Sequence, residues 1–159
     1  MSRDPAARTG FRLRDIRPDD FEALHRLDQA CFEPDISYSR AELRAFLRLP
    51  TLEGAVAETE GGDVAGFVIG YRAPGNVGHI VTLDVAAAHR RSGVGRALLA
   101  EAMERLAHHG VQRFRLEVDV RNAAAIAFYE SFGFRESRRL PDYYGDGREG
   151  IEMTLQREG

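Results

Sequence analysis

Residues 90–96, with the sequence RRSGVGR, combine glycine and arginine in a pattern that suits the binding of a phosphorylated ligand. They follow an apolar run at residues 78–85 and precede a long amphipathic run, so the predicted order is strand, loop and helix. The first amides of a helix have no internal partners, and the helix dipole favours negative charge at that end. Gly93 and Gly95 allow a phosphate to approach the backbone, and the arginines add positive charge. The segment therefore predicts a site for a phosphorylated cofactor.

The glycine pattern alone does not identify the ligand, and a plain turn remains an alternative at this point. The Rossmann spacing G-x-G-x-x-G is absent from the loop, which argues against a dinucleotide site. The Gly-Lys-Ser/Thr end of a P-loop is absent as well, which argues against that kind of nucleotide site.

Three titratable residues are candidates for acid–base chemistry. Glu117 lies in the middle of an apolar strand, where an inward carboxylate is costly unless it is used or paired, and the alternation leaves open whether it faces solvent. His79 begins the strand before the loop, and a lone histidine is also compatible with a structural role. Tyr129 lies on a helix that Asn122 is predicted to cap, and its alternative role is a core aromatic beside Phe128.

Hydrophobic periodicity predicts the elements that hold these residues. Alternating or apolar runs predict strands at residues 11–16, 52–58, 64–72, 78–85, 114–120, 134–139 and 151–155. Apolar faces with the helical period predict helices at residues 18–31, 39–49, 93–109 and 122–132. Hairpins indicate antiparallel pairs, whereas the strand–helix–strand unit around residues 80–120 indicates a parallel crossover. We expect a mixed α/β sheet with helices on both faces.

Length and composition indicate one globular domain. The 159 residues are enough for one sizeable core, and 43% of them are hydrophobic and 30% charged. Residues 1–10 are expected to form a disordered arm without the apolar core of a signal peptide, and residues 11–159 a single domain. The formal charge of −3 argues against a nucleic-acid partner, and no apolar run is long enough to cross a membrane. Cys31 is the single cysteine, which excludes an internal disulfide and fits a cytoplasmic location.

Several motifs together resemble the GCN5-related N-acetyltransferase (GNAT) family. RRSGVG at residues 90–95 is similar to its R/Q-x-x-G-x-G/A pyrophosphate loop, and LEV at residues 116–118 followed by NAAAIAFYESFGF at residues 122–134 extends the match. These segments and DYYGDGREGIEM at residues 142–153 most resemble protein N-terminal acetyltransferases, including the bacterial enzyme that modifies a ribosomal protein and its archaeal relatives. The resemblance covers residues 11–155 and is strong from residue 78 onward.

The resemblance implies a GNAT fold, with a mixed, mostly antiparallel sheet of six to seven strands flanked by about four helices. It implies acetyl-CoA as the co-substrate and direct transfer, in a ternary complex, to the α-amine of a protein or peptide, with a ribosomal protein among the candidate acceptors. Other acceptors that stay open are a small-molecule amine and a lysine side chain, and a non-catalytic acyl-CoA-binding regulatory module is the alternative of another class. No metal is expected. The sheet edges leave a monomer and a homodimer both open.

The resemblance also implies roles for individual residues. Glu117 is the expected general base, His79 a second basic residue, and Tyr129 the proton donor to the departing thiolate. The loop amides hold the pyrophosphate and a free strand edge at residues 83–85 holds the pantetheine arm, so the expected cofactor contacts are Leu83, Asp84, Val85, Arg90, Arg91, Ser92, Gly93, Val94, Gly95, Arg96, Asn122 and Tyr129. The expected acceptor contacts are Phe32, Pro34, Tyr38, Tyr143 and Tyr144.

Two further expectations concern the region before the second helix. Glu33 and Asp35 are expected to favour a positively charged acceptor, because both carboxylates fall in the loop that faces the acceptor cleft in the family. Cys31 is expected in the first helix, away from the cofactor motif, so no residue is predicted to carry the acetyl group covalently.

Overall fold

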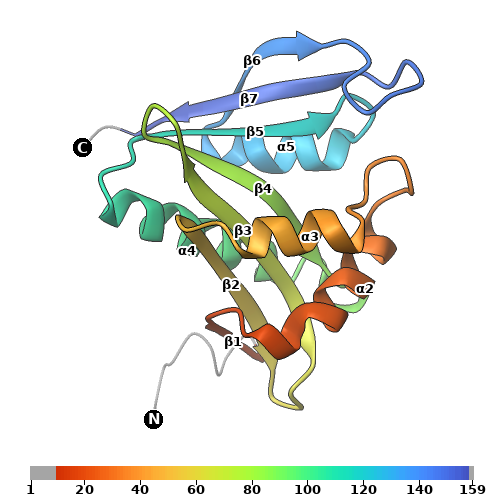
Figure 1. Cartoon of the computed structure of the whole chain (residues 1–159), viewed down its shortest axis with the longest axis vertical. Coiled ribbons are helices and arrows are strands. Elements are labelled where there is room, and N and C mark those ends of the chain that lie inside the picture. Colours follow the sequence, from red (N-terminus) through yellow and green to blue (C-terminus); the bar gives the residue numbers. More distant parts are fainter. Residues whose placement is uncertain (1–9, 158–159) are drawn as a thin grey trace.

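The computed structural model describes residues 10–157, in which seven strands form one sheet with the order β1-β2-β3-β4-β5-β7-β6 (Figure 1). The strands are β1 (Phe11–Arg14), β2 (Leu52–Thr59), β3 (Val64–Ala73), β4 (Val77–Val85), β5 (Arg113–Asp119), β6 (Arg135–Leu140) and β7 (Gly150–Gln156). The helices are α2 (Phe21–Cys31), α3 (Arg40–Leu47), α4 (Val94–His108) and α5 (Ala123–Phe132), with short 3-10 turns η1 (Pro18–Asp20) and η2 (Ala87–His89). Residues 1–9 of the predicted arm lie outside the described residues.

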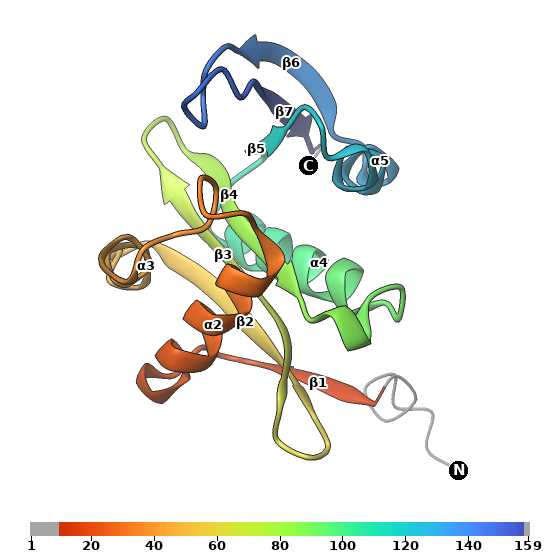
Figure 2. The same cartoon turned by 90° about the vertical axis from the view of Figure 1, so that its right-hand side faces the viewer.

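Helices cover both faces of the sheet, as the sequence predicts (Figure 2). Helices α2 and α3 pack on one face around Leu24, Leu43 and Phe67. Helices α4 and α5 pack on the other face, where Leu98 and Phe114 belong to a larger core. All neighbouring strands are antiparallel except β4 and β5, which are parallel. The predicted mixed, mostly antiparallel sheet of six to seven strands with about four helices is confirmed.

Local sequence patterns predicted most boundaries of the helices and strands to within two residues. The Ser39 side chain accepts a hydrogen bond from the backbone amide of Glu42 and caps α3, and Asn122 caps α5 in the same way. Gly133 ends α5 with a φ of 108°, which is a left-handed conformation that favours glycine. The helix predicted from Pro18 begins with the turn η1 instead, because the Asp20 side chain accepts the Arg17 backbone N–H and tightens the corner.

Strand β4 changes the face to which its side chains point. Gly70 of β3 pairs with Ile80, whereas the preceding Ile69 pairs with Thr82, so Val81 is an extra residue in β4. Ile80 accordingly belongs to the core under α4, whereas Thr82 and Asp84 turn towards α2. The bulge thus sends a polar stretch of β4 to the face that carries α2 and α3.

Strands β4 and β5 separate in the middle of the sheet. Val77, Gly78 and His79 pair with Arg113, Phe114 and Arg115, and beyond these three pairs the two strands diverge (Figure 1). Residues 80–85 of β4 and 116–119 of β5 therefore keep edges that no longer pair with each other. The resulting gap lies between the glycine-rich loop and the loop that follows α2.

Candidate active site

Two cavities meet at the gap between β4 and β5. The tyrosine cavity, of about 500 Å³, is lined by Tyr38, Tyr143 and Tyr144 among others. The glycine-loop cavity, of about 830 Å³, lies beside the start of α4. Six residues line both cavities: Cys31, Phe32, Leu83, Asn122, Ala125 and Tyr129. Ligands that occupy the two cavities together would therefore meet beside Tyr129.

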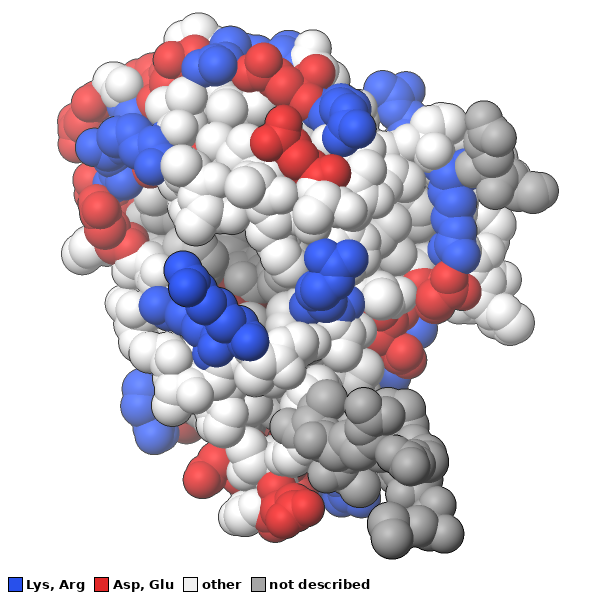
Figure 3. Space-filling view, turned by 180° about the vertical axis from the view of Figure 1, so that it is seen from behind, with Lys and Arg blue, Asp and Glu red and all other residues white. Residues whose placement is uncertain are grey.

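The glycine-loop cavity has the backbone geometry of an anion site. Gly93 precedes α4 with a φ of 89° and Arg91 has a φ of 61°, so the loop turns sharply into the helix. The cavity is lined by Gly93, Gly95 and three arginines, Arg90, Arg91 and Arg96. Figure 3 shows a hollow flanked by basic side chains on the side of α4 and α5. Positive charge and the helix start thus face the same cavity.

Two of these arginines are held in place by neighbouring elements. Arg90 Nε donates to the Val85 carbonyl at 3.2 Å. The Arg96 guanidinium lies 4.6 Å from the Phe132 ring centroid and donates to Ser131 Oγ at 3.0 Å, which ties α4 to α5.

Three predicted cofactor residues keep their side chains out of the cavity. The Ser92 hydroxyl donates to the His89 carbonyl within the loop, and Val94 is buried in the core under α4. The Asp84 side chain turns towards α2 because of the bulge in β4, so that residue can offer a cofactor its backbone alone. Leu83 and Val85, its neighbours, do line the cavity.

Glu117 and His79 form one unit across the gap. Glu117 Oε1 lies 2.7 Å from His79 Nε2, and both side chains are largely buried. Glu117 Oε2 lies 3.5 Å from Arg115 Nε, and the Tyr71 ring packs edge-on against His79 at 5.4 Å. Glu117 lines the tyrosine cavity, and His79 stands behind it. Sequence patterns did not point to Tyr71 or Arg115, although Arg115 lies two residues before Glu117 and so shares its face.

Tyr129 lies where the two cavities meet, and its hydroxyl is protonated. Its ring packs against Phe128 and Phe134 at centroid distances of 5.3 and 5.9 Å. Burial, together with the nearby Asp84, raises the pKa of the Tyr129 hydroxyl above its ordinary value. The hydroxyl is therefore a proton donor at neutral pH.

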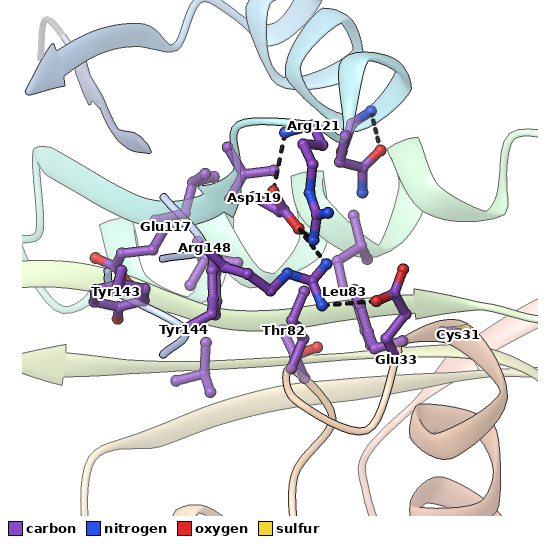
Figure 4. A pocket seen from close by; sticks show the side chains of 18 of the residues that line it. Cys31, Glu33, Thr82, Leu83, Glu117, Asp119, Arg121, Tyr143, Tyr144 and Arg148 are labelled. Carbon is purple, nitrogen blue, oxygen red and sulfur yellow. Dashed lines mark hydrogen bonds and ion pairs between the residues drawn. The ribbon is translucent and has the colours of Figure 1, made fainter. Parts of the chain in front are cut away.

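Aromatic residues line the tyrosine cavity. Tyr143 and Tyr144 stack edge to face with centroids 4.9 Å apart (Figure 4). Burial and the neighbouring Glu117 raise the pKa of the Tyr143 hydroxyl to about 12. The Tyr38 hydroxyl donates to the Val81 carbonyl at 3.3 Å, and Phe32 also lines the cavity. Pro34 does not belong to the lining residues.

An ion-pair bridge that the sequence did not predict spans the tyrosine cavity. Arg148 Nη1 lies 2.6 Å from Glu33 Oε2, and Nη2 lies 2.7 Å from Asp119 Oδ2 (Figure 4). Asp35 Oδ2 is 3.8 Å from the same guanidinium. Arg148 offsets part of the negative charge, but its single guanidinium is shared by three carboxylates, Glu33, Asp35 and Asp119. The preference for a positively charged acceptor therefore stays a prediction. The partners are far apart in sequence, so no local pattern marks them.

Cys31 ends the first α-helix as predicted, but it lies beside the cofactor motif, so the prediction that it lies away from that motif is wrong. The end of α2 reaches β4, where the Cys31 thiol donates to the Val85 carbonyl at 3.5 Å. Burial, and then the nearby Asp84, raise the pKa of the Cys31 thiol. A thiol that stays protonated is a poor nucleophile, so its position gives no support to a covalent acetyl carrier.

Residues 10–157 show neither of two other classes of feature. No group of three or more His, Cys, Asp or Glu residues in this part of the chain is arranged to hold a metal ion. No helix in the same part has the length and apolar character needed to cross a membrane.

Comparisons with known proteins agree with this geometry. The model of the acetyltransferase (GNAT) family matches residues 21–134. The ribosomal protein bS18 alanine N-acetyltransferase of Escherichia coli is 49% identical over 70 residues, which are 42% of this chain and 47% of that protein. The N-alpha-acetyltransferase of Sulfurisphaera tokodaii is 37% identical over 78 residues, which are 48% of this chain and 47% of that protein.

The matched part spans about half the length of these two curated relatives. The similarity of fold extends further. The crystal structure of Ard1 from Thermoplasma volcanium has a TM-score of 0.86 at 27% sequence identity and covers 94% of this chain and 99% of its own. With the family model matching most of the chain on a sheet of this topology, the chain belongs to the GNAT family of acetyltransferases.

Proposed function

We propose that this acetyltransferase uses acetyl-CoA to acetylate the α-amine of a protein or peptide N-terminus by direct transfer between two bound substrates. The observation that carries the proposal is the meeting of two cavities at Tyr129, with Glu117 in the wall of one of them. The names of the two curated relatives, both N-terminal acetyltransferases, support the choice of acceptor.

The glycine-loop cavity fits the proposed co-substrate. Its arginines and the first amides of α4 suit a pyrophosphate, and a volume of about 830 Å³ is within the range of cofactor sites. The edge of β4 at residues 83–85 has lost its β5 neighbour, so it can pair with the amide groups of a pantetheine arm as with an added strand. When bound, acetyl-CoA supplies a thioester carbonyl that an amine can attack.

Glu117 accepts the proton of the acceptor amine in this proposal. An ammonium group has no lone pair, and an α-amine with a pKa near 8 needs less help from a base than a lysine near 10.4. His79 Nε2 and Arg115 Nε hold the two carboxylate oxygens, which fixes the direction of the base. His79 acts through Glu117 and is a positioning residue.

Tyr129 delivers a proton to the departing thiolate. Its hydroxyl lies at the junction of both cavities and is protonated at neutral pH, and burial raises its pKa further above the ordinary value. Asn122, which caps α5, also lines both cavities and fixes the helix that carries Tyr129. Proton removal and proton delivery are thus assigned to two different elements, β5 and α5.

The walls of the tyrosine cavity suit a peptide. Tyr143 and Tyr144 offer flat apolar faces together with hydroxyls that can bond a backbone carbonyl. Phe32 and Tyr38 line the same cavity from the loop between α2 and α3. An extended N-terminus that enters here would bring its amine towards Glu117.

The proposal is tested by incubating the purified protein with acetyl-CoA and peptides of varied first residue, and by locating the added mass with tandem mass spectrometry. We expect acetylation of α-amines that is lost in Glu117→Gln and strongly slowed in Tyr129→Phe. Acetylation confined to lysine side chains or small amines would move the assignment to another acceptor class. Tight binding of acetyl-CoA without transfer to any amine would indicate a binding module.

A further inference from the structure

Two buried carboxyl groups face each other beside the gap and have no place in the transfer chemistry described above. Asp28 on α2 is 0% exposed, and Asp84 on β4 is 1% exposed. The end of α2 and the loop after it pack on β4, where the Cys31 thiol donates to the Val85 carbonyl, and Asp28 lies close enough to Asp84 to raise its pKa. Two carboxylates so close together in an apolar interior repel each other and are costly to bury, so the pair requires an explanation.

The four oxygens of the pair can be satisfied by a single proton. Asp28 Oδ2 accepts the backbone N–H of Tyr38 at 2.7 Å, and Asp84 Oδ1 accepts the Thr82 hydroxyl at 2.5 Å. Within the described residues, the other two oxygens, Asp28 Oδ1 and Asp84 Oδ2, are buried and have no donor. Both are acceptors, so a proton on Asp84 Oδ2 that is donated to Asp28 Oδ1 gives every oxygen a partner.

The pair connects the walls of the two cavities. Asp84 lies between Leu83 and Val85, which line the glycine-loop cavity. Asp28 holds the backbone of Tyr38, which lines the tyrosine cavity and whose hydroxyl donates to the Val81 carbonyl. One contact between α2 and β4 therefore positions the loop on the acceptor side relative to the strand on the cofactor side.

We propose that Asp28 and Asp84 share one proton and that this pair positions the acceptor loop against the cofactor strand for acetyl transfer. Both are positioning residues. The inference rests on the proposed function, which assigns the tyrosine cavity to the acceptor and the glycine-loop cavity to the cofactor. The pair itself is a property of the fold and can be tested without any acceptor.

The surroundings favour one proton on the pair. Burial, and then the neighbouring Asp28, raise the pKa of Asp84 well above its ordinary value, while the Thr82 hydroxyl opposes this shift. Asp84 also lies near the Cys31 thiol on α2 and the Tyr129 hydroxyl on α5. The pKa values of both groups are raised, mainly by burial and then by Asp84. Burial and the negative charge of Asp28 therefore keep Asp84 protonated at a pH where an exposed aspartate is ionised.

Two substitutions at Asp84 test whether a hydrogen-bond donor to Asp28 is needed at this position. Asp84→Asn keeps a donor towards Asp28 and an acceptor for Thr82, whereas Asp84→Ala leaves Asp28 Oδ1 buried without a partner. We expect the KM values for acetyl-CoA and for the peptide to rise about tenfold in Asp84→Ala, because the loop at Tyr38 and the strand at residues 83–85 would no longer be held against each other. The Asn variant is expected to restore both KM values to within about threefold of the wild type.

The shared proton is tested by denaturant unfolding of the wild type, Asp84→Asn and the exposed control Asp19→Asn across pH 4 to 9. A native pKa raised above the unfolded value contributes stability that is present at low pH and is lost as pH rises through the native pKa. The wild type should therefore lose stability relative to Asp84→Asn as pH rises, whereas Asp19→Asn should follow the wild type. The same series is repeated with a chelator.

Each alternative result has a definite meaning. Parallel pH curves for the wild type and Asp84→Asn would overturn the shared proton. A loss of wild-type stability on adding the chelator would show a bridging cation instead. Equal KM values for Asp84→Ala and Asp84→Asn would overturn the positioning role. Failure of the chain to acetylate any peptide would leave the unfolding series intact, so the proposed function and this inference fail separately.

Discussion

At the scale of single residues, the proposed base Glu117 and its partner His79 are the most informative feature. The family resemblance implied roles for both Glu117 and His79, and the structure joins them at 2.7 Å because the two strands still pair at His79 and Arg115 just before they diverge. A carboxylate held from both sides has a fixed orientation towards the cavity. The geometry therefore favours a base that removes a proton without having to move.

Replacing Glu117 by Gln should lower kcat by about 100-fold or more, because an amide cannot accept the amine proton. KM for acetyl-CoA should change little, since Glu117 lines the tyrosine cavity and not the glycine-loop cavity. Steady-state kinetics with a peptide acceptor provide the measurement. The matched control is Glu152→Gln, which alters the residue paired with Glu117 across β5 and β7. A comparable loss of kcat in both variants would assign the effect to the sheet.

At the scale of elements, the glycine-rich loop and the helix caps were predictable, whereas the bulge in β4 was not. Gly93, Asn122 and Gly133 act next to the helices that they begin or end, so a short stretch of sequence identifies them. The extra residue Val81 depends on how β3 pairs with β4, and nothing in the apolar run marks it. The same bulge turns the Asp84 side chain towards α2, which the alternation of the sequence does not indicate.

The conformation of the loop gives a test at this scale. Gly93→Ala should cost about 1–2 kcal/mol in unfolding free energy, because a side chain disfavours the left-handed region. It should also raise the Kd for acetyl-CoA, since the loop amides would shift. Gly110→Ala is the matched control, because Gly110 has a φ of 87° at the other end of α4. Calorimetric titration should show weaker binding for the first variant alone, and equal weakening in both would contradict a role of the loop.

The corner between β1 and α2 gives a second test. The Arg14 guanidinium holds the pKa of Asp20 below its ordinary value, and Asp20 also accepts the Arg17 amide. A lowered pKa contributes stability above the ordinary pKa that is lost as pH falls through the native value. Asp20→Asn should therefore cost about 2 kcal/mol at pH 7 and progressively less in acid. Denaturant unfolding checks this, and a pH-independent difference would contradict it; Asp19→Asn is the exposed control.

At the scale of the whole molecule, the sheet has two parts, β1–β4 and β5–β7. They are joined by three residue pairs between β4 and β5 and diverge beyond these pairs. The sequence predicted the fold well, because its periodicities and turn residues are local. It did not predict the Arg148 bridge or the pair of Asp28 with Asp84, because those partners lie on different elements and meet only after the chain has folded. The part of the candidate site that follows from motifs was predictable, and the part that follows from tertiary contacts was not.

The junction of the cavities predicts the kinetic order of the reaction. With room for both substrates beside Tyr129, initial-velocity plots at varied acetyl-CoA and peptide should intersect, as expected when both are bound before transfer. Incubation with acetyl-CoA alone should add no acetyl mass to the protein, because the Cys31 thiol stays protonated. Parallel plots, or an acetylated protein that passes its acetyl group to a peptide, would contradict direct transfer.

The divergence of β4 and β5 also bears on the resistance of the protein to proteolysis. It leaves strand edges in the interior of the sheet whose backbone groups are not paired across the gap. A ligand that pairs with one of these edges acts as a missing strand, and at a hundredfold excess over its Kd it stabilises the folded state by about 2.7 kcal/mol. Digestion by proteases proceeds through opened states whose population this stabilisation reduces. On the proposed function, the resistance of the folded protein to proteolysis would therefore rise with the concentration of acetyl-CoA.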